Sequence, residues 1–232
     1  TSNDVYIKLS TIPSITECRF LNNFGSSLHI NCDLDSNVTI NTCTFDSNTN
    51  TNNDNGAGIV IESTAELGIV YEECTFRNNN ANTNGGALSI SKLQCYFISC
   101  SFEGNSASSG GSLYINEQTH YIQSCTFTSE TTSTANRGHS IHIGQNSQVF
   151  ITDSDFINCG TENFGNVIAF KGEYLFIEES TIEFTSSIQS RGLLILNDKS
   201  IELNGCTFTN CNAGDSENGG AIFYDNPPTN SQ

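Results

Sequence analysis

The tripeptide Cys-x-Phe recurs along the chain at a nearly constant interval, and this repeat restricts the fold more than any other feature. Six copies carry both residues: Cys18–Phe20, Cys43–Phe45, Cys74–Phe76, Cys100–Phe102, Cys125–Phe127 and Cys206–Phe208. Two degenerate copies, Ser154-Asp155-Phe156 and Ser180-Thr181-Ile182, fill the long gap. The eight anchors lie 25 to 31 residues apart. Self-similarity with such a period is the signature of a repeat architecture.

Two further segments accompany each anchor, and both alternate between apolar and other residues. Apolar pairs lie five and three residues before the anchor, as in Val38/Ile40, Ile69/Tyr71, Val149/Ile151 and Leu175/Ile177. A glycine-led segment follows the anchor, as in Gly85-Gly86-Ala87-Leu88 and Gly219-Gly220-Ala221-Ile222. A period of two predicts strands, and no segment shows a helical period.

Three short strands per repeat, joined by Asn, Gly and Ser turns, describe one coil of a parallel β-helix, which stacks on the next coil to bury its inner face. We therefore expect an all-β, right-handed parallel β-helix (solenoid) of about eight coils over residues 1–224. At roughly 4.8 Å per coil the rod would be on the order of 38 Å long. Right-handedness is inferred from the coil length and from the absence of a hexapeptide repeat. Residues 225–232, with Pro227 and Pro228, would form a tail outside the ladder.

The spacing between motifs predicts where the coils differ. The first inward aliphatic of each glycine-led segment is taken as Ile59, Leu88, Leu113, Ile141, Ile168 and Leu194. The distance from anchor to aliphatic varies most, so loops near 49–55, 80–84, 106–109, 129–137 and 212–218 should project from one edge. Variable loops on a rigid scaffold are common sites of function. Val5, Ile7 and Leu9 are expected to form the last strand of an incomplete preceding coil.

The charge balance excludes several classes of partner. Lys and Arg total 8 against 25 Asp and Glu, which gives a net charge of -17. Nucleic acid and anionic membrane surfaces would be repelled by this charge. No run of 18 or more apolar residues is present, so we expect no membrane span. We also expect the segment to belong to a longer chain.

At this point the motifs resemble a known family. Gly85-Gly86-Ala87-Leu88 and Gly219-Gly220-Ala221-Ile222 match the GGA[ILV] motif of the chlamydial polymorphic membrane proteins. The FxxN motif of that family matches Phe20/Asn23, Phe45/Asn48, Phe76/Asn79 and Phe102/Asn105, while Phe127 is followed by Glu130 instead. Similar repeats occur in surface proteins of some protists. The resemblance implies a β-helical domain exposed on the cell surface, to which adhesion is attributed.

The same motif residues have a structural interpretation that requires no partner. Each Phe should point inward and stack on the Phe of the neighbouring coil, and each Asn should bond to the amide above it. Gly-Gly permits backbone conformations and close approaches that other residues do not.

The ten cysteines leave two alternatives open. Cys18, Cys43, Cys74, Cys100 and Cys125 form one predicted inward column, which Ser154 and Ser180 continue, and this favours small buried side chains. Disulfides between adjacent coils stay possible, because the coil spacing is within the range that they tolerate. The scattered His residues and the absence of Cys-x-x-Cys argue against a zinc site, and we expect neither a metal nor a cofactor.

The function that we favour is a non-enzymatic, surface-exposed or extracellular, adhesin-like domain whose variable loops bind a protein or glycan on another surface. A structural module that stacks end to end into a filament or coat is the alternative. The third hypothesis is a polysaccharide-active β-helix enzyme. Its candidate residues are Asp153/Asp155, Asp33/Asp35 and Gly138-His139-Ser140, and paired carboxylates can serve acid–base chemistry. Asn37-Val38-Thr39 is a sequon for N-glycosylation at Asn37.

Overall fold

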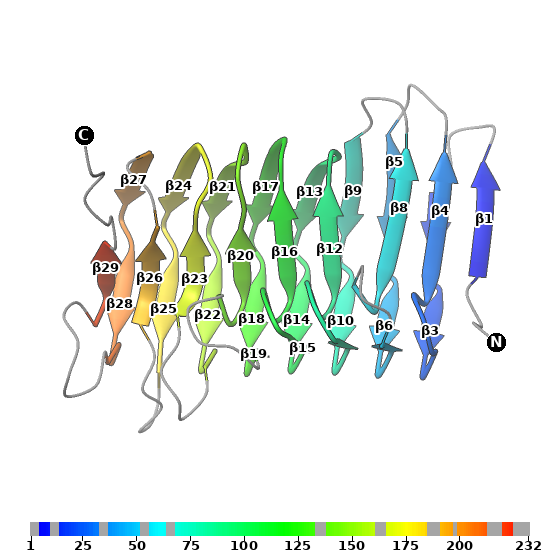
Figure 1. Ribbon diagram of the computed structural model, residues 1–232, viewed down its shortest axis with the longest axis horizontal. Coiled ribbons are helices and arrows are strands. Elements are labelled where there is room, and N and C mark those ends of the chain that lie inside the picture. Colours follow the sequence, from blue (N-terminus) through cyan, green and yellow to red (C-terminus); the bar gives the residue numbers. More distant parts are fainter. Residues whose placement is uncertain are drawn as a thin grey trace, which may run out of the picture.

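The computed structural model describes residues 5–9, 14–32, 37–51, 56–63, 68–132, 138–160, 166–184, 191–196, 199–212 and 220–224. In this part of the chain there are 29 strands and no helix. The strands form four parallel sheets that run along a rod (Figure 1). The predicted all-β parallel solenoid is therefore confirmed.

Three long sheets form the walls of the rod. The glycine sheet contains β1 (Val5–Leu9), β4 (Leu28–Cys32), β8 (Ile59–Ser63), β12 (Leu88–Ser91), β16 (Leu113–Asn116), β20 (Ile141–Ile143), β23 (Asn166–Phe170), β26 (Arg191–Ile195) and β29 (Ile222–Tyr224). The pre-anchor sheet contains β2 (Ser14–Thr16), β5 (Val38–Asn41), β9 (Gly68–Glu72), β13 (Gln94–Ile98), β17 (Thr119–Gln123), β21 (Gln148–Thr152), β24 (Tyr174–Glu178) and β27 (Ser200–Asn204). The anchor sheet contains β3 (Arg19–Leu21), β6 (Thr44–Asp46), β10 (Thr75–Arg77), β14 (Ser101–Glu103), β18 (Thr126–Thr128), β22 (Asp155–Ile157), β25 (Thr181–Glu183) and β28 (Thr207–Thr209).

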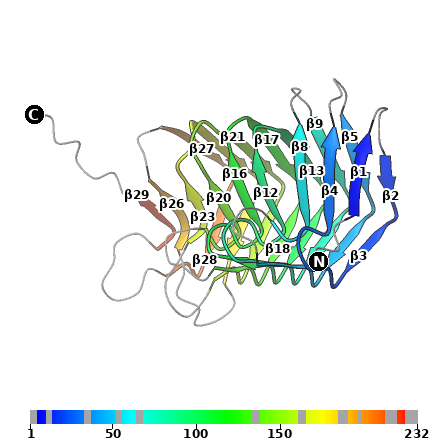
Figure 2. The ribbon, with the colours of Figure 1, turned by 45° about the vertical axis from the view of Figure 1, so that its right-hand side comes forward.

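The chain passes through the three walls in the same order in every coil. In Figure 1 the glycine strands run upward at the front and the pre-anchor strands run downward behind them, while the chain advances from right to left. This course is right-handed, as predicted. Figure 2 shows the glycine and pre-anchor sheets as separate walls of the rod. β1 pairs with β4 from Val5↔Leu28 onward, so the strand expected from an incomplete preceding coil is present.

Two columns of residues in left-handed backbone conformation form the bends beside the anchor strands: one precedes every anchor, and the other follows every anchor strand except β25. Thr42 and Glu73, with φ of 52° and 51°, precede the anchor cysteines, and Ser47 and Asn78, with φ of 56° and 53°, follow the anchor phenylalanines. This conformation costs roughly 1–2 kcal/mol for a residue with a side chain. Hydrogen bonds between coils hold it, since the Thr42 amide donates to the carbonyl of Glu72 at 2.9 Å.

A fourth, short sheet adds one strand to four of the coils, beyond the three strands per coil that were predicted. It contains β7 (Thr49–Asn50), β11 (Asn80–Ala81), β15 (Ser106–Ala107) and β19 (Thr131–Thr132). These strands occupy the beginnings of four of the five predicted loops. The predicted loop edge is therefore partly a continuation of the ladder. Of the loops, 52–55, 133–137 and 213–218 lie outside the described residues, as does the predicted tail 225–232.

The number of closed turns is slightly lower than the eight coils predicted. Strands of all eight repeat copies are present in the anchor and pre-anchor sheets. About six turns have a buried interior, because the inner residues of the first and last copies, such as Ile15 and Leu203, are covered on one side and only partly buried. The end coils act as partial covers of the core.

The register of the seventh coil differs from the prediction by one residue. Leu193, and not Leu194, pairs with Ile168 and lies in the inward column, whereas Leu194 pairs with Ala169 on the outer face. All residues of β23 and β26 are buried, so these strands are covered on both faces. Continuous apolar runs are typical of parallel strands that are buried on both faces. Such a run does not alternate, so the sequence does not show which of its residues point inward.

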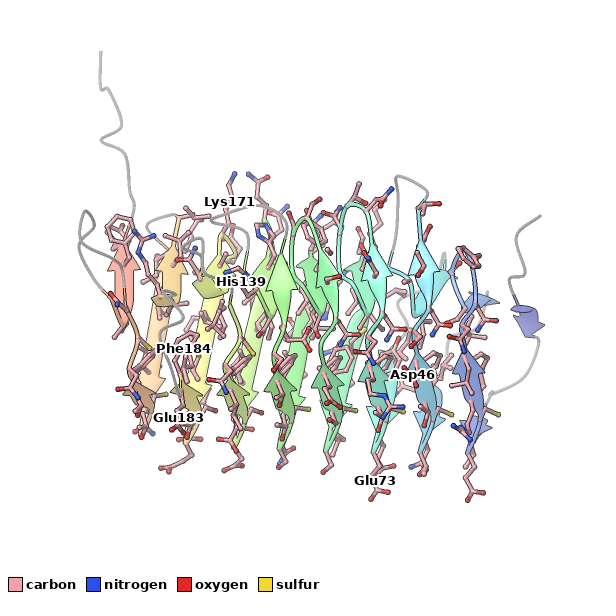
Figure 3. All side chains as sticks on the ribbon, turned by 90° about the horizontal axis from the view of Figure 1, so that it is seen from below. Asp46, Glu73, His139, Lys171, Glu183 and Phe184 are labelled. Carbon is pink, nitrogen blue, oxygen red and sulfur yellow. The ribbon has the colours of Figure 1, made fainter. Side chains whose placement is uncertain are left out.

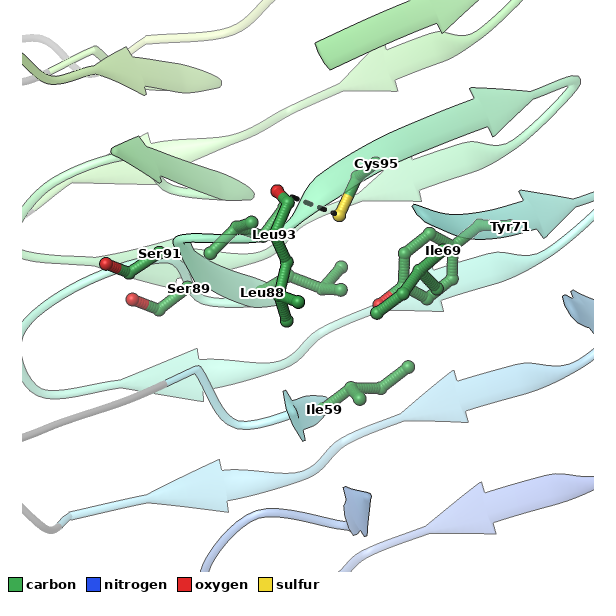
Figure 4. A pocket seen from close by; sticks show the side chains of 9 residues that line it. Ile59, Ile69, Tyr71, Leu88, Ser89, Ser91, Leu93 and Cys95 are labelled. Atoms are coloured by element: carbon green, nitrogen blue, oxygen red, sulfur yellow. Dashed lines mark hydrogen bonds between the residues drawn. The ribbon is translucent and has the colours of Figure 1, made fainter. Parts of the chain in front are cut away.

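The interior is filled by side chains. A cavity of about 10 Å³ lies between the glycine and pre-anchor sheets, lined by residues that include Ile59, Leu88 and Cys95 (Figure 4). A buried water requires about this volume, so the cavity has no room for a larger ligand. This cavity is therefore not a ligand site.

We predict that Phe76→Ala destabilises the rod strongly. Phe76 is fully buried between two stacked rings, and truncation of such a phenylalanine costs about 3–5 kcal/mol. Chemical denaturation monitored by circular dichroism measures this change. Phe24→Ala is the matched control, because the Phe24 side chain is 67% exposed. Equal losses of stability in the two variants would contradict the prediction.

Candidate functional site

The anchor phenylalanines from Phe20 to Phe156 form one continuous stack inside the rod. Ring centroids are 4.7 Å apart for Phe20–Phe45, 5.0 Å for Phe45–Phe76, 5.0 Å for Phe76–Phe102, 4.5 Å for Phe102–Phe127 and 4.7 Å for Phe127–Phe156. The predicted inward stacking is confirmed. These rings are core residues, and none except the half-buried Phe20 at the end of the stack is accessible to a partner.

The asparagines of the FxxN motif form a hydrogen-bonded ladder beside this stack. The side-chain amide nitrogen of Asn23 donates to Oδ1 of Asn48 at 2.9 Å, Asn48 donates to Asn79 at 2.8 Å, and Asn79 donates to Asn105 at 2.9 Å. Each Oδ1 also accepts the backbone N–H of the preceding asparagine, and Asn79 Nδ2 donates to the carbonyl of Phe45 at 2.9 Å. The predicted amide-to-amide bonds are present, and they satisfy buried polar groups of the bend.

The glycine motif is also explained by packing. Gly85 has a φ of 57°, and a Cβ at Gly86 would lie 2.2 Å from the carbonyl oxygen of Gly111 in the next coil. Ala87 and Leu88 are buried. In the second copy, Ile222 is 38% exposed and Gly220 and Ala221 are partly buried, because they lie at the end of the rod; Gly219 lies outside the described residues.

Glu130 takes the place of asparagine in the fifth copy and ends the ladder. Its Oε1 accepts a hydrogen bond from Asn105 Nδ2 at 3.2 Å, and Oε2 has no partner among the described residues. Burial raises the pKa of Glu130 to about 8, although hydrogen bonds from Ser112 and Asn105 partly oppose the shift. The carboxyl is therefore mainly protonated at neutral pH.

The cysteines of the anchor column are free thiols that donate to backbone carbonyls. Cys74 Sγ donates to the carbonyl of Ile40 at 3.2 Å, and Cys100 Sγ to that of Tyr71 at 3.4 Å. Ser154 Oγ donates to the carbonyl of Thr152, two residues earlier, as Cys125 does to that of Gln123. This shared bond explains why Ser can replace Cys. All nine cysteines whose side chains are described are unbridged, and burial raises the pKa of Cys43 to about 11.

The residues considered for catalysis are not brought together. Asp153 and Asp155 are exposed, and Asp33 and Asp35 lie outside the described residues. His139 is buried, and burial lowers its pKa to about 4. Figure 3 shows His139 and Phe184 directed into the rod, and Glu73 and Lys171 directed away from it. Among the described residues, no group of three or more His, Cys, Asp or Glu could hold a metal ion.

Asn37 of the sequon lies at the beginning of β5 and is exposed. Its Oδ1 accepts the backbone N–H of Gly68 at 3.1 Å. Glycosylation at Asn37 stays a prediction.

An aromatic ladder on the outside of the pre-anchor sheet was missed from the sequence. Tyr96, Tyr121, Phe150 and Phe176 occupy the same outward position in successive strands. Tyr96 and Tyr121 stack with centroids 4.9 Å apart, and Tyr121 and Phe150 with centroids 5.2 Å apart. Phe176 tilts by 48° from Phe150. The signal was available, because each of these residues lies between the two members of an inward apolar pair.

The aromatic ladder presents ring edges, and it is bordered by acidic groups. Stacked rings lie across the rod axis, so their edges and the two tyrosine hydroxyls face solvent, and Tyr121 is 36% exposed. The outer face of the pre-anchor sheet carries Glu72, Glu178 and Glu202. Its described residues include no Lys or Arg. Hydrogen bonds fix these carboxylates, as from Asn41 to Glu72 at 2.8 Å and from Asn204 to Glu178 at 2.7 Å.

Comparisons of the chain with protein-family models, with curated proteins and with solved structures gave no match. In the part of the chain that is described, no helix is long and apolar enough to cross a membrane.

We predict that Glu130→Gln removes part of the pH dependence of stability. The folded-state pKa of Glu130 lies above the ordinary value of 4.5, so the native state binds a proton more tightly than the unfolded state. The wild-type rod should therefore lose stability on this account as pH rises from about 4.5 to about 8, by on the order of a few kcal/mol. The glutamine amide cannot ionise, so the variant should lack this loss.

Urea unfolding at pH 5, 7 and 9 measures the difference between the two proteins. Glu103→Gln is the control, because Glu103 is an exposed carboxylate of the neighbouring coil. A parallel loss of stability in wild type and Glu130→Gln would show that the buried carboxyl is not responsible.

We also predict that a membrane-impermeant thiol reagent modifies the native rod at Cys18 and leaves Cys43, Cys74, Cys95, Cys100, Cys125 and Cys159 unmodified. Cys18 is exposed, whereas the other six thiols are buried, and thiolate formation is disfavoured where burial raises the pKa, as it does to about 12 for Cys159. All six should react after unfolding without a reducing agent, as measured by peptide mass spectrometry. A requirement for prior reduction would instead establish disulfides between coils.

Proposed function

We propose that this chain is a non-enzymatic, surface-exposed or extracellular, adhesin-like domain that binds a partner protein through its side wall. It would belong to the β-helical surface proteins that share the GGA[ILV] and FxxN repeats. The observation that carries the proposal is the aromatic ladder of Tyr96, Tyr121, Phe150 and Phe176 on the outside of the pre-anchor sheet.

The aromatic ladder has the properties of a binding strip. The backbone beneath it is held by parallel pairing on both sides of each strand, so the rings are fixed before a partner arrives. Tyrosine and other aromatic residues are enriched at the energetic centres of protein interfaces. Rigid side chains of this kind lose little conformational entropy on binding.

The charges beside the ladder indicate the chemistry of the partner. Glu72, Glu178 and Glu202 lie on the same face, and Glu73, Asp153 and Glu179 follow the adjoining bend. A surface with Lys or Arg around an apolar centre would complement this arrangement. We therefore propose a basic protein surface as the partner.

The short fourth sheet supports a second contribution from the loop edge. β11 and β15 fix residues 80–84 and 106–109 against the neighbouring coils, with the amide of Ser109 donating to the carbonyl of Thr83 at 2.9 Å. These segments form an ordered edge of the rod, at which the loops that differ in length between coils begin.

The alternative, a module that stacks end to end, is favoured by a specific observation at the two ends. Leu21 and Phe24 at one end are 37% and 67% exposed, and Ile222 and Tyr224 at the other end are 38% and 51% exposed. Apolar side chains beside unpaired strand edges favour pairing with another chain.

The test is the adhesion of beads that carry the purified rod, attached through a C-terminal tag, to cultured cells and to immobilised matrix proteins of different isoelectric points. We predict binding that favours basic proteins and falls at high salt, because exposed charges are then screened. Tyr121→Ser/Phe150→Ser should reduce adhesion by about tenfold or more, as loss of two central aromatic contacts would.

Thr126→Ser/Asp155→Asn is the control, because both residues lie on the outer face of the anchor sheet and the aromatic ladder is intact. Circular dichroism confirms that each variant is folded. Unchanged adhesion of the ladder variant would overturn the assignment of the binding face. Absence of adhesion, together with elongation of the free rod in light scattering as its concentration rises, would favour the filament module.

A further inference from the structure

A hollow of about 520 Å³ lies on the glycine-sheet side of the rod, away from the aromatic ladder. It is lined by Tyr114, Asn116, His142, Gly144, Gln145, Lys171 and Leu196. These residues come from the ends of β16, β20, β23 and β26 and from the turns that follow them. Hollows of this size accommodate small organic ligands.

The hollow exists because a glycine interrupts a column of side chains. The column beyond the strand ends reads Asn116, Gly144, Lys171 and Leu196, as shown by backbone bonds from Gly144 to Ile115 at 2.7 Å, Lys171 to Ile143 at 2.8 Å and Leu196 to Phe170 at 2.9 Å. Gly144 leaves a gap between Asn116 and Lys171. A Cβ at Gly144 would lie 2.6 Å from Oδ1 of Asn116, so the Asn116 amide extends over the gap.

One wall of the hollow is aromatic. Tyr114 and His142 stack with ring centroids 5.1 Å apart and an interplanar angle of 1°. His142 is buried, so this pair forms a fixed wall, and Leu196 adds an apolar surface. Because the two rings stack on each other, they present their edges to the hollow, and these edges with Leu196 give it apolar surface for the C–H groups of a ligand.

The hollow carries one of the few cationic side chains of an acidic molecule. The chain has only 8 Lys and Arg, and one of them, Lys171, stands at this hollow with the primary amides of Asn116 and Gln145. In Figure 3 the Lys171 side chain extends away from the rod. An ammonium group binds a carboxylate, whereas a primary amide can donate to one hydroxyl and accept from another.

We propose that this hollow is a binding site for a sugar that carries one carboxylate, of the uronic acid class. Lys171 binds the carboxylate, Asn116 and Gln145 bind ring hydroxyls, and the sugar ring lies in the gap at Gly144, beside Tyr114. A multiply charged anion is disfavoured, because a single ammonium group would have to offset the repulsion from a chain of net charge -17. The same net charge makes non-specific capture of anions unfavourable.

The experiment is a ligand-observed NMR titration of the full chain with D-glucuronate, and with D-glucose and acetate as probes of the two halves of the ligand. We expect glucuronate to bind at least about tenfold more tightly than either probe, because only glucuronate makes both sets of contacts. Lys171→Gln should weaken glucuronate binding by about tenfold, which is the effect of removing one charge-assisted hydrogen bond. Gly144→Ala should also weaken binding, since the methyl group displaces the Asn116 amide.

Lys92→Gln is the control, because Lys92 is an exposed lysine in the turn between β12 and β13 and does not line the hollow. Its glucuronate affinity should equal that of the wild type. Equal losses in Lys92→Gln and Lys171→Gln would overturn the site in favour of general charge attraction. Acetate binding as tight as glucuronate binding would overturn the sugar specificity, and failure of the folded wild type to bind glucuronate would overturn the proposal.

Discussion

The backbone of each coil makes its hydrogen bonds with the coils before and after it, both in the strands and in the bends. Thr44 donates to the carbonyl of Cys18, and Thr75 to that of Cys43, both at 2.9 Å. Side-chain columns follow from this register, because residues at equivalent positions are brought to the same place about 27 residues apart. The phenylalanine stack, the asparagine ladder and the thiol column are therefore three results of one backbone arrangement.

Most of the interior could be predicted from the sequence because its residues repeat. The anchor Phe and Cys positions and the apolar pairs recur in the same order, and the structure places them inward as expected. The inward position of Leu193 could not be predicted, since the run Arg191–Ile195 does not alternate. The two-residue strands of the fourth sheet were not recognised either, because segments as short as Asn80–Ala81 carry no periodicity.

The outside of the rod was harder to predict than the inside. Inward residues are constrained by packing, whereas an outward residue is constrained only by what it meets in solution or in a complex. The aromatic residues at 96, 121, 150 and 176 are on the outer face, although each lies within a run of apolar residues. In the sequence they therefore resemble additional core residues. Their outward direction becomes evident only when the apolar residues on both sides are assigned to the interior. The hollow at Gly144 could not be predicted, because it depends on the turn that follows β20.

The asparagine ladder also gives the interior of the rod a direction. From Asn23 to Asn79 each side-chain Nδ2 donates to the Oδ1 of the next asparagine along the rod, while Asn48 and Asn79 also donate back to the carbonyls of Phe20 and Phe45. Hydrogen bonds linked in a chain polarise one another, and this chain ends where Asn105 Nδ2 donates to the carboxyl of Glu130. The asparagine ladder thus ends at the one fully buried acid among the described residues, so ionisation of Glu130 would place a charge directly against its last amide.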